Sequence, residues 1–485
     1  MKKEDLFDLL GGADEKEVMN AREYRAQKTR PAWVKWAALA ACVALAFGAV
    51  VGYPLLFSGG SPEVAGNYPP GVTVVSAQTP DPVSAEMDNQ QFIESDAHWN
   101  WWQAYREKVA ESTPLQEGLN GCYTSVMAQL LEAEDENTVA SPLNIYIAFA
   151  MLAETADGNT RQQILDLLGS PDIETLRQNV RTIWQSNYVD TPMVKSLLAN
   201  SLWLREGDNF NEKTLQILAE NYLASSFRGQ PGSDEMNKAL QQWTDANTGG
   251  LLKEYTKDLK LDPSMVAAIM STLYYKAIWS NEFYAEDNTQ EIFHGTKGDT
   301  DATMMHRSDT MFVYRTDAFT AVSLGLIDSG SMFFYLPSEG TDVNSLASDP
   351  DVLNAIWHDN DPTDEGWAVP LVNLSVPKFK VSAKTDLLDA MKALGLTDAL
   401  DPGTADFTPL REEGENLFIS TAEHAATVEI DENGVTGAAY TMMAYGEGAL
   451  LVEEEIDFVL DRPFLFVVTG MDGSVLFSGI VRNIE

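Results

Sequence analysis

The chain has 485 residues, of which 45% are hydrophobic, and 73 acidic residues against 32 basic ones give it a formal charge of −41. This hydrophobic content allows a large core and excludes a wholly disordered protein. So negative a surface repels nucleic-acid phosphates, and we expect no nucleic-acid partner. The two cysteines, Cys42 and Cys122, and the five scattered histidines form no disulfide framework and no metal-ligand motif. We therefore expect neither a metal nor another cofactor.

The first predicted element is a membrane anchor. Residues 36–57 read WAALAACVALAFGAVVGYPLLF, which is 22 residues without a charge and long enough to cross a bilayer as a helix. Basic residues precede this run, whereas no Lys or Arg follows it until Arg106. The asymmetry predicts a cytoplasmic tail at 1–35 and an extracellular remainder. A cleaved signal peptide and lipidation at Cys42 stay open as alternatives.

Residues 58–97 are predicted to form an extracellular stalk, because 58–90 are rich in Pro, Gly and Ser. The sequence HWNWWQAYREKV (98–109) predicts a helix whose Trp99, Trp101 and Trp102 pack on the main domain. That domain is expected to span 98–485.

Within this domain, helical and strand patterns come in blocks, which favours an α+β fold over a doubly wound sheet. The segments NTRQQILDLLG, MNKALQQWTDANTGG and KTDLLDAMKALG predict helices that end at glycine. The segment FLFVVTGMDGSVLFSGIV predicts a hairpin that turns at Asp472-Gly473. In VNLSVPKFKV the alternation slips by one position across Pro377, which indicates a bulge.

Catalytic motifs are missing from the sequence: GxSxG, GxxxxGK[ST] and GxGxxG do not occur. A hydrolytic pair of Ser141 and His424 is the one catalytic hypothesis worth stating. It is disfavoured because His424 lies in STAEHAATVEI, where the alternation predicts a strand and a hydrogen-bonded structural histidine. We expect no enzymatic activity.

Five segments, in the same order as in the family, resemble the serpins over roughly residues 119–485. They are NTVASPLNIYIAFAMLAETADGNTRQQILDLLG, LANSLWLREGDNFNEKTLQILAENYLASSFRG, MSTLYYKAIWSNEF, VPKFKVSAKTDLLDAMKALGLTDAL and DRPFLFVV. The resemblance implies three β-sheets, eight or nine helices and an exposed reactive loop. It also implies a monomeric, single-use inhibitor that forms a covalent complex with a target serine protease. After cleavage the loop inserts as a new strand of the main sheet and carries the protease with it.

The resemblance also assigns roles to individual residues. The hinge of the loop maps onto Glu432, Gly434, Val435, Thr436, Gly437, Ala438 and Ala439. Insertion begins near Trp279 and Lys378, the latter as the usual partner of the hinge acid Glu432. A buried cluster that controls opening of the sheet maps onto Ser141, Asn144, Ser271 and His424. If the segment from Val435 forms a strand, alternate residues share one face. These are Val435, Gly437, Ala439, Thr441 and Met443. None of them is charged, so this face can be buried without the cost of burying a charge.

Counting from the hinge acid places the scissile bond at Gly448–Ala449, with Ala449–Leu450 and Leu450–Leu451 as alternatives. Counting back from Pro463 points nearer Val452, so the window from Gly446 to Val452 stays open. No Lys or Arg occurs between Arg411 and Arg462, which excludes trypsin-like targets and favours elastase- or subtilisin-like ones, with a Glu-specific protease open through Glu447. The predicted function is thus a protease trap at the cell surface, single-pass and with its N-terminus in the cytoplasm. The tail-plus-anchor layout suggests a bacterial source. The alternative is a non-inhibitory surface protein whose loop is cleaved without trapping.

Overall fold

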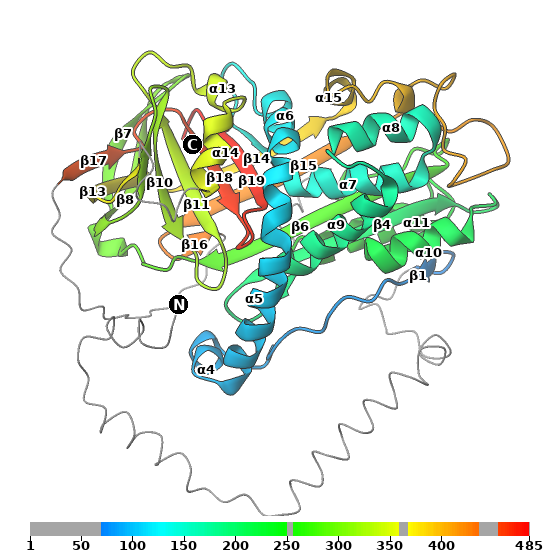
Figure 1. The fold of residues 1–485 in the computed structure, drawn as a ribbon, viewed down its shortest axis with the longest axis horizontal. Helices are drawn as coiled ribbons and strands as arrows, with labels where there is room; N and C mark the ends of the chain where they lie inside the picture. The colour runs from blue at the N-terminus through cyan, green and yellow to red at the C-terminus, as the bar shows by residue number, and fades with distance from the viewer. Residues whose placement is uncertain (1–68, 250–255, 358–366, 436–453, 485) are drawn as a thin grey trace, which may run out of the picture. The chain divides into compact units, whose positions relative to one another are not determined.

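The computed structural model describes residues 69–249, 256–357, 367–435 and 454–484 (Figure 1). These residues belong to one compact unit and form three β-sheets with helices packed around them. The α+β class and the three sheets expected from the sequence are confirmed. No helix among these residues is long and apolar enough to cross a membrane, and the predicted span at 36–57 lies outside them.

The largest sheet has eight strands, and it positions the hinge of the predicted reactive loop. Its order is β1-β5-β4-β6-β16-β15-β14, with β3 paired to the outer end of β4, and β4 and β5 are its parallel pair. The strands are β1 (Thr73–Val75), β3 (Val189–Asp190), β4 (Lys195–Arg205), β5 (Ala224–Gly229), β6 (Ala267–Ile278), β14 (Phe379–Asp386), β15 (Glu423–Asp431) and β16 (Gly434–Val435).

Two further sheets complete the framework. A seven-stranded antiparallel sheet has the order β12-β9-β10-β11-β18-β19-β2, and a four-stranded sheet has the order β17-β13-β8-β7. Their strands are β2 (Thr138–Ala140), β7 (Thr289–Gly295), β8 (Gly298–Thr310), β9 (Val313–Arg315), β10 (Phe319–Gly325), β11 (Ser331–Pro337), β12 (Trp367–Ala368), β13 (Leu371–Pro377), β17 (Glu455–Val459), β18 (Phe464–Thr469) and β19 (Val475–Val481). β17 follows the predicted loop and pairs in parallel with β13.

The helix α7 (Pro142–Thr155) is buried in the core, where it contacts both β6 and β19. Every residue of α7 except Ala148 is buried, as expected for a helix that is apolar on all sides. Pro142 starts the helix at a position where the missing N–H costs nothing. The other helices are α4 (Asn89–Ile93), α5 (Asp96–Gln116), α6 (Asn120–Leu130), α8 (Gly158–Leu167), α9 (Ile173–Asn187), α10 (Glu212–Asn221), α11 (Asp234–Asn247), α13 (Val343–Leu346), α14 (Pro350–Trp357), α15 (Leu388–Ala393) and the 3₁₀ turns η1 (Glu117–Leu119), η2 (Ala285–Asp287) and η3 (Asp398–Leu400).

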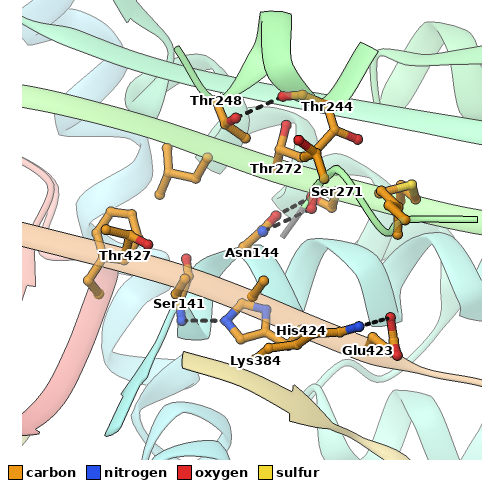
Figure 2. A pocket seen from close by; sticks show the side chains of 17 residues that line it. Ser141, Asn144, Thr244, Thr248, Ser271, Thr272, Lys384, Glu423, His424 and Thr427 are labelled. Atoms are coloured by element: carbon orange, nitrogen blue, oxygen red, sulfur yellow. Dashed lines mark hydrogen bonds and ion pairs between the residues drawn. The ribbon is translucent and has the colours of Figure 1, made fainter. Parts of the chain in front are cut away.

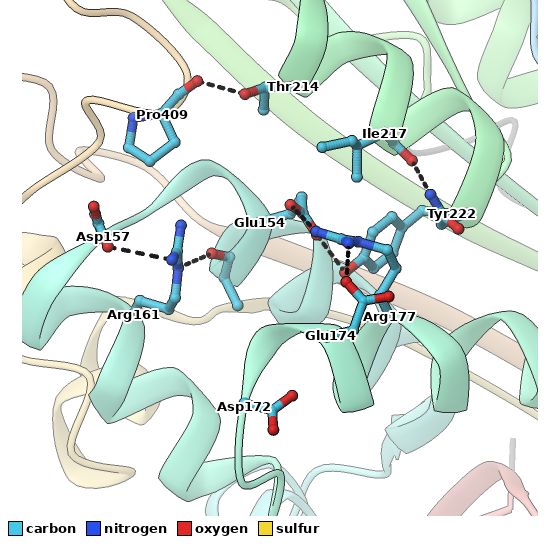
Figure 3. Close-up of polar contacts among 12 residues, drawn as sticks. Glu154, Asp157, Arg161, Asp172, Glu174, Arg177, Thr214, Ile217, Tyr222 and Pro409 are labelled. Atoms are coloured by element: carbon cyan, nitrogen blue, oxygen red, sulfur yellow. Dashed lines mark hydrogen bonds and ion pairs between the residues drawn. The ribbon is translucent and has the colours of Figure 1, made fainter.

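A buried ion pair fixes α9 and α10 against α7 (Figure 3). Glu154, near the end of α7, accepts two hydrogen bonds from the Arg177 guanidinium at 2.9 and 3.1 Å. The Tyr222 hydroxyl, just after α10, donates to the same carboxylate at 3.1 Å. A bidentate pair with its remaining acceptor filled is the geometry in which a buried carboxylate is satisfied.

Two local predictions have different outcomes. The hairpin at 464–481 is confirmed, with Asp472-Gly473 in its turn. The bulge predicted at Pro377 is wrong, because β13 ends at Pro377 in the four-stranded sheet while β14 starts at Phe379 in the eight-stranded one. The slip in alternation therefore marks a change of sheet, where the inward face of the chain changes as well.

The predicted stalk also differs where the structure describes it. In residues 69–97, β1 pairs with β5 and α4 is capped by Asp88, so this part is folded and not extended. The domain boundary expected at residue 98 falls inside α5. The reason is that apolar side chains scattered among the polar ones of this segment, Phe92 above all, find a hydrophobic surface to cover.

Candidate functional site

The predicted hinge enters the eight-stranded sheet through a tight turn. Asp431 ends β15, and its carboxylate accepts the backbone N–H of Asn433 at 2.8 Å and of Gly434 at 3.3 Å. This is the local hydrogen bonding by which aspartate favours turns. The chain then reverses into β16, where Val435 pairs with Ile430 of β15 and with Ala277 of β6. Gly434 and Val435, the described start of the hinge strand, thus already lie between β6 and β15.

Trp279 anchors this turn through two hydrogen bonds. Its backbone N–H donates to the Asn433 carbonyl at 3.1 Å, and its indole Nε1 donates to the Asp431 carbonyl at 2.9 Å. The side chain is only 1% exposed. The structure therefore places Trp279 at the start of β16, where the family resemblance assigns the beginning of insertion.

Gly434 cannot carry a side chain in this position. A Cβ atom added there would lie 2.1 Å from the carbonyl oxygen of Ala277, and the residue has a φ of +156°. Backbone approaches of this kind admit only glycine. The next residue, Val435, is 1% exposed and belongs to the hydrophobic core, so the alternation from Val435 starts on the buried face.

The hinge acid Glu432 is ion-paired. Lys378 Nζ lies 2.9 Å from its Oε2 and 3.0 Å from its Oε1, and Asn288 donates to the same carboxylate. Partial burial alone would raise the pKa of Glu432, but the hydrogen bonds from Lys378 and Asn288 outweigh it and lower the pKa below the ordinary value. Lys378 comes directly after β13, at the change of sheet, so this pair connects the hinge to the junction between two sheets.

The structure brings the four residues of the predicted cluster together in two pairs (Figure 2). His424 Nε2 accepts the backbone N–H of Ser141 at 3.0 Å, which links β15 to the start of α7. Asn144 Nδ2 donates to the Ser271 carbonyl at 3.0 Å, and the Ser271 hydroxyl donates back to Asn144, which links α7 to β6. β15 and β6 thus each have their own polar contact with α7.

The geometry of Ser141 and His424 is not that of a nucleophile and its base. The Ser141 hydroxyl donates to the Leu476 carbonyl at 2.6 Å, away from the imidazole. Burial lowers the pKa of His424 from 6.5 to about 4. A neutral, backbone-bonded histidine of this kind is structural, as its place in the strand pattern predicts.

The four residues line a cavity of about 120 Å³ between β6 and β15. Sequence reasoning missed part of the cavity wall. The missed residues are Thr244 of α11, the C-cap Thr248 of that helix, and the ion pair of Lys384 and Glu423, whose Nζ and Oε2 lie 3.0 Å apart. The signal available for the threonines was their spacing of four residues, which puts both on one face of a helix.

The remaining predicted site residues lie outside the described residues. These are Thr436, Gly437, Ala438 and Ala439 of the hinge, and Gly448, Ala449, Leu450 and Leu451 around the scissile bond. The described chain resumes at Glu454, whose carbonyl accepts the N–H of Leu371 at 2.9 Å and whose carboxylate pairs with Arg315 at 3.0 Å.

Three sheets around the buried α7, with β16 paired between β6 and β15 of the largest sheet, form the architecture of a family of serine protease inhibitors. Comparison with known proteins agrees: the family model for "Serpin (serine protease inhibitor)" matches residues 121–484. The chain belongs to the serpin family, whose members are generally inhibitors and not enzymes.

Individual relatives support this assignment along most of their own lengths. Serpin-ZX of Arabidopsis thaliana is 30% identical over 366 residues, which cover 72% of this chain and 92% of the relative. Arabidopsis AtSerpin1 in its native stressed conformation superposes with a TM-score of 0.64 at 27% identity, covering 78% of this chain and 98% of that one. The native state of Tengpin, a thermophilic serpin, has a similar fold, with a TM-score of 0.66 at 24% identity over 76% of this chain and 94% of that one.

Proposed function

We propose that the protein inhibits serine proteases once per molecule, by inserting its cleaved reactive loop between β6 and β15. One observation carries the proposal. β16 is hydrogen-bonded to β6 on one side and to β15 on the other, and no other described strand occupies the position between them. Adjacent strands lie about 4.8 Å apart, so β6 and β15 are two strand spacings apart where β16 lies between them.

The register of β16 indicates where an inserted strand would run. Val435 pairs with Ile430 in an antiparallel ladder, so continuing that ladder for six residues would bring residue 441 opposite His424. The same extension would bring it opposite Ser271 of β6, since Val435 pairs with Ala277. The cavity between Ser271 and His424 thus lies on the path of the proposed strand. This supports a role for the polar cluster in opening the sheet.

The proposed targets are proteases with small or apolar specificity, such as elastase or subtilisin. The support is the sequence of the loop, which has no Lys or Arg between Arg411 and Arg462 for a trypsin-like pocket to bind. Gly448–Ala449 is the proposed scissile bond. Mass spectrometry of the fragments after digestion tests this assignment, since it identifies the new N-terminus directly.

We also propose that residues 36–57 anchor the protein in a membrane with the serpin domain on the extracellular side. The support is the uncharged run of 22 residues and the basic residues that precede it. Treating intact cells with a protease tests the topology: loss of the serpin domain with retention of the N-terminal tail supports it, and protection of the domain contradicts it.

The test of inhibition is a denaturing gel after mixing the full-length protein with elastase and, separately, with subtilisin. A stable covalent adduct with loss of protease activity supports trapping. Cleavage without an adduct and without loss of activity supports the non-inhibitory alternative. The matched variant is Gly437→Asp, which puts a carboxylate on the face that the alternation from Val435 predicts to be buried when the loop inserts. Because burying a charge is costly, this variant is expected to be cleaved without forming the adduct.

A further inference from the structure

Residues 83–116 pack on the domain although they precede the region 121–484 that matches the serpin family. We name this segment, which contains α4 and α5, the N-terminal clasp (Figure 1). Its side chains form a hydrophobic cluster of their own with parts of the domain. The buried members are Phe92, Tyr105, Val189, Met193, Val194, Ile278 and Ile327, with Trp101 and Trp102 packed around them.

The cluster covers the end of β6 that receives the hinge. Ile278 is the last residue of β6; its side chain is 2% exposed and lies in the cluster with Phe92, which is fully buried. The backbone of the same Ile278 pairs with Gly434 of β16, and its carbonyl accepts the N–H of Ile327 at 2.9 Å. One residue therefore connects the clasp, the hinge and the turn between β10 and β11.

A polar contact reinforces this connection. His98 Nε2 in the first turn of α5 lies 2.8 Å from Asp328 Oδ2, and their side chains are 17% and 10% exposed. Asp328 is in the turn between β10 and β11 and has a φ of +53°. The hydroxyl of the next residue, Ser329, is hydrogen-bonded to the Tyr275 hydroxyl of β6 at 2.9 Å. The clasp thus holds the turn against which β6 ends.

The far end of the clasp is fixed as well. Asp472, 1% exposed in the turn between β18 and β19, accepts hydrogen bonds from Ser112 Oγ at 2.6 Å and from Gln116 Nε2 at 3.2 Å, both in α5. Ser186 and Asn187 of α9 donate to the same oxygen at 2.7 and 3.0 Å. Because an unsatisfied buried carboxylate is costly, α5 is bound firmly at this end.

We propose that the N-terminal clasp positions the end of β6 for entry of the reactive loop, with Phe92, His98 and Asp328 as positioning residues. The two-residue β16 can hydrogen-bond to β6 and β15 only if both of these strands stay in register. The ends of strands open locally unless tertiary contacts hold them. Ile278 and Gly434 form the outermost pair of this ladder, so a loose β6 end would delay insertion. The proposal rests on the loop-insertion function, whose timing it governs: delayed insertion lets the protease complete hydrolysis before it is trapped.

The first test needs no protease. Amide hydrogen exchange of the full-length protein is followed by mass spectrometry in the wild type, Phe92→Ala and Asp328→Asn. The control variant is Trp99→Ser, because Trp99 is next to His98 in the chain but its side chain is 63% exposed. Asparagine tolerates the left-handed backbone of residue 328, so this milder variant keeps the proposal testable if Phe92→Ala fails to fold. Removing the charge of Asp328 from this largely buried pair is expected to speed amide exchange at 275–279 and 433–435 about tenfold. Unchanged exchange there, or an equal rise in all three sheets, overturns the proposal.

The second test separates positioning from folding. With elastase as the probe, Asp328→Asn is expected to be cleaved at the wild-type rate while the fraction trapped as covalent adduct falls severalfold, and Trp99→Ser is expected to match the wild type. An unchanged trapped fraction in Asp328→Asn overturns the positioning role. If the wild type itself forms no adduct, the inhibitory function fails, whereas the exchange experiment still decides whether the clasp holds β6.

Discussion

The buried His424 predicts a specific loss of stability in mild acid. Its Nε2 accepts the Ser141 backbone N–H at 3.0 Å, which requires the neutral imidazole. Protonation would turn this acceptor into a donor that faces another donor, inside the core and at the seam between β6 and β15. Burial accordingly lowers the pKa of His424 to about 4.

The direction and the size of this loss of stability follow from the difference in proton binding between the folded and the unfolded state. The folded state binds the proton less tightly than the unfolded state, whose histidine has a pKa of 6.5, so the stability is complete above pH 6.5 and falls as the pH drops from 6.5 to 4. With 1.36 kcal/mol per pH unit, the His424 contribution lost between pH 7 and pH 5 is about 2 kcal/mol.

The assay is urea unfolding at pH 7 and pH 5, followed by tryptophan fluorescence, for the wild type and His424→Gln. The glutamine amide oxygen can accept the Ser141 N–H and does not titrate. The many carboxylates titrate in both proteins, so their contribution cancels in the comparison. We expect the wild type to lose about 2 kcal/mol more than the variant over this interval. An equal loss in both proteins would refute the assignment of a buried, neutral His424.

Three further changes test the hinge and its surroundings. Gly434→Ala puts a Cβ 2.1 Å from the Ala277 carbonyl oxygen, so it should destabilise the domain by about 2 kcal/mol in thermal unfolding. The same change should speed hydrogen exchange at the amides of β16. A variant with wild-type stability and wild-type exchange would contradict this close approach of the two backbones. Lys378→Met removes the partner of Glu432 and, after allowance for solvent, should cost about 1 kcal/mol at pH 7. Because the pair keeps the pKa of Glu432 below its ordinary 4.5, this stabilisation is present above pH 4.5 and is lost in the wild type as the pH falls further, so the two unfolding curves should converge in acid. Asp472→Asn sets an amide against several donors and should cost about 2 kcal/mol, measured by urea unfolding; a neutral result would mean that the donors find other acceptors.

What the sequence predicts well is what local chemistry determines. The turn at Asp472-Gly473 and the helix α8, which ends just before Gly169, follow from residues that are adjacent in the chain, and both are confirmed. The pairing of β14 with the eight-stranded sheet could not be predicted, since alternation shows which side chains share a face and not which sheet the strand joins. The N-terminal clasp was predicted only in part: the helix at 98–109 is confirmed within α5, where Trp101 and Trp102 pack on the domain and Trp99 is exposed, whereas α4 was missed for a related reason. Phe92 is one apolar residue in a polar stretch, and the surface it covers is built by residues more than ninety positions away.

The site itself depended on the resemblance, because its polar residues come from α7, β6 and β15 and share no local motif. Once assembled, their chemistry explains why they are polar. If β6 and β15 were held to the core only by close-packed apolar side chains, those contacts would be lost as soon as the strands shifted. The pairs Asn144–Ser271 and Ser141–His424 instead tie each strand separately to α7 by a few directed hydrogen bonds. Such bonds can be exchanged for others with an incoming strand at little net cost, whereas the ion pair of Glu154 and the clasp keep the surrounding elements in place. This arrangement meets what the proposed insertion requires, namely that a strand enters the sheet while the core stays packed.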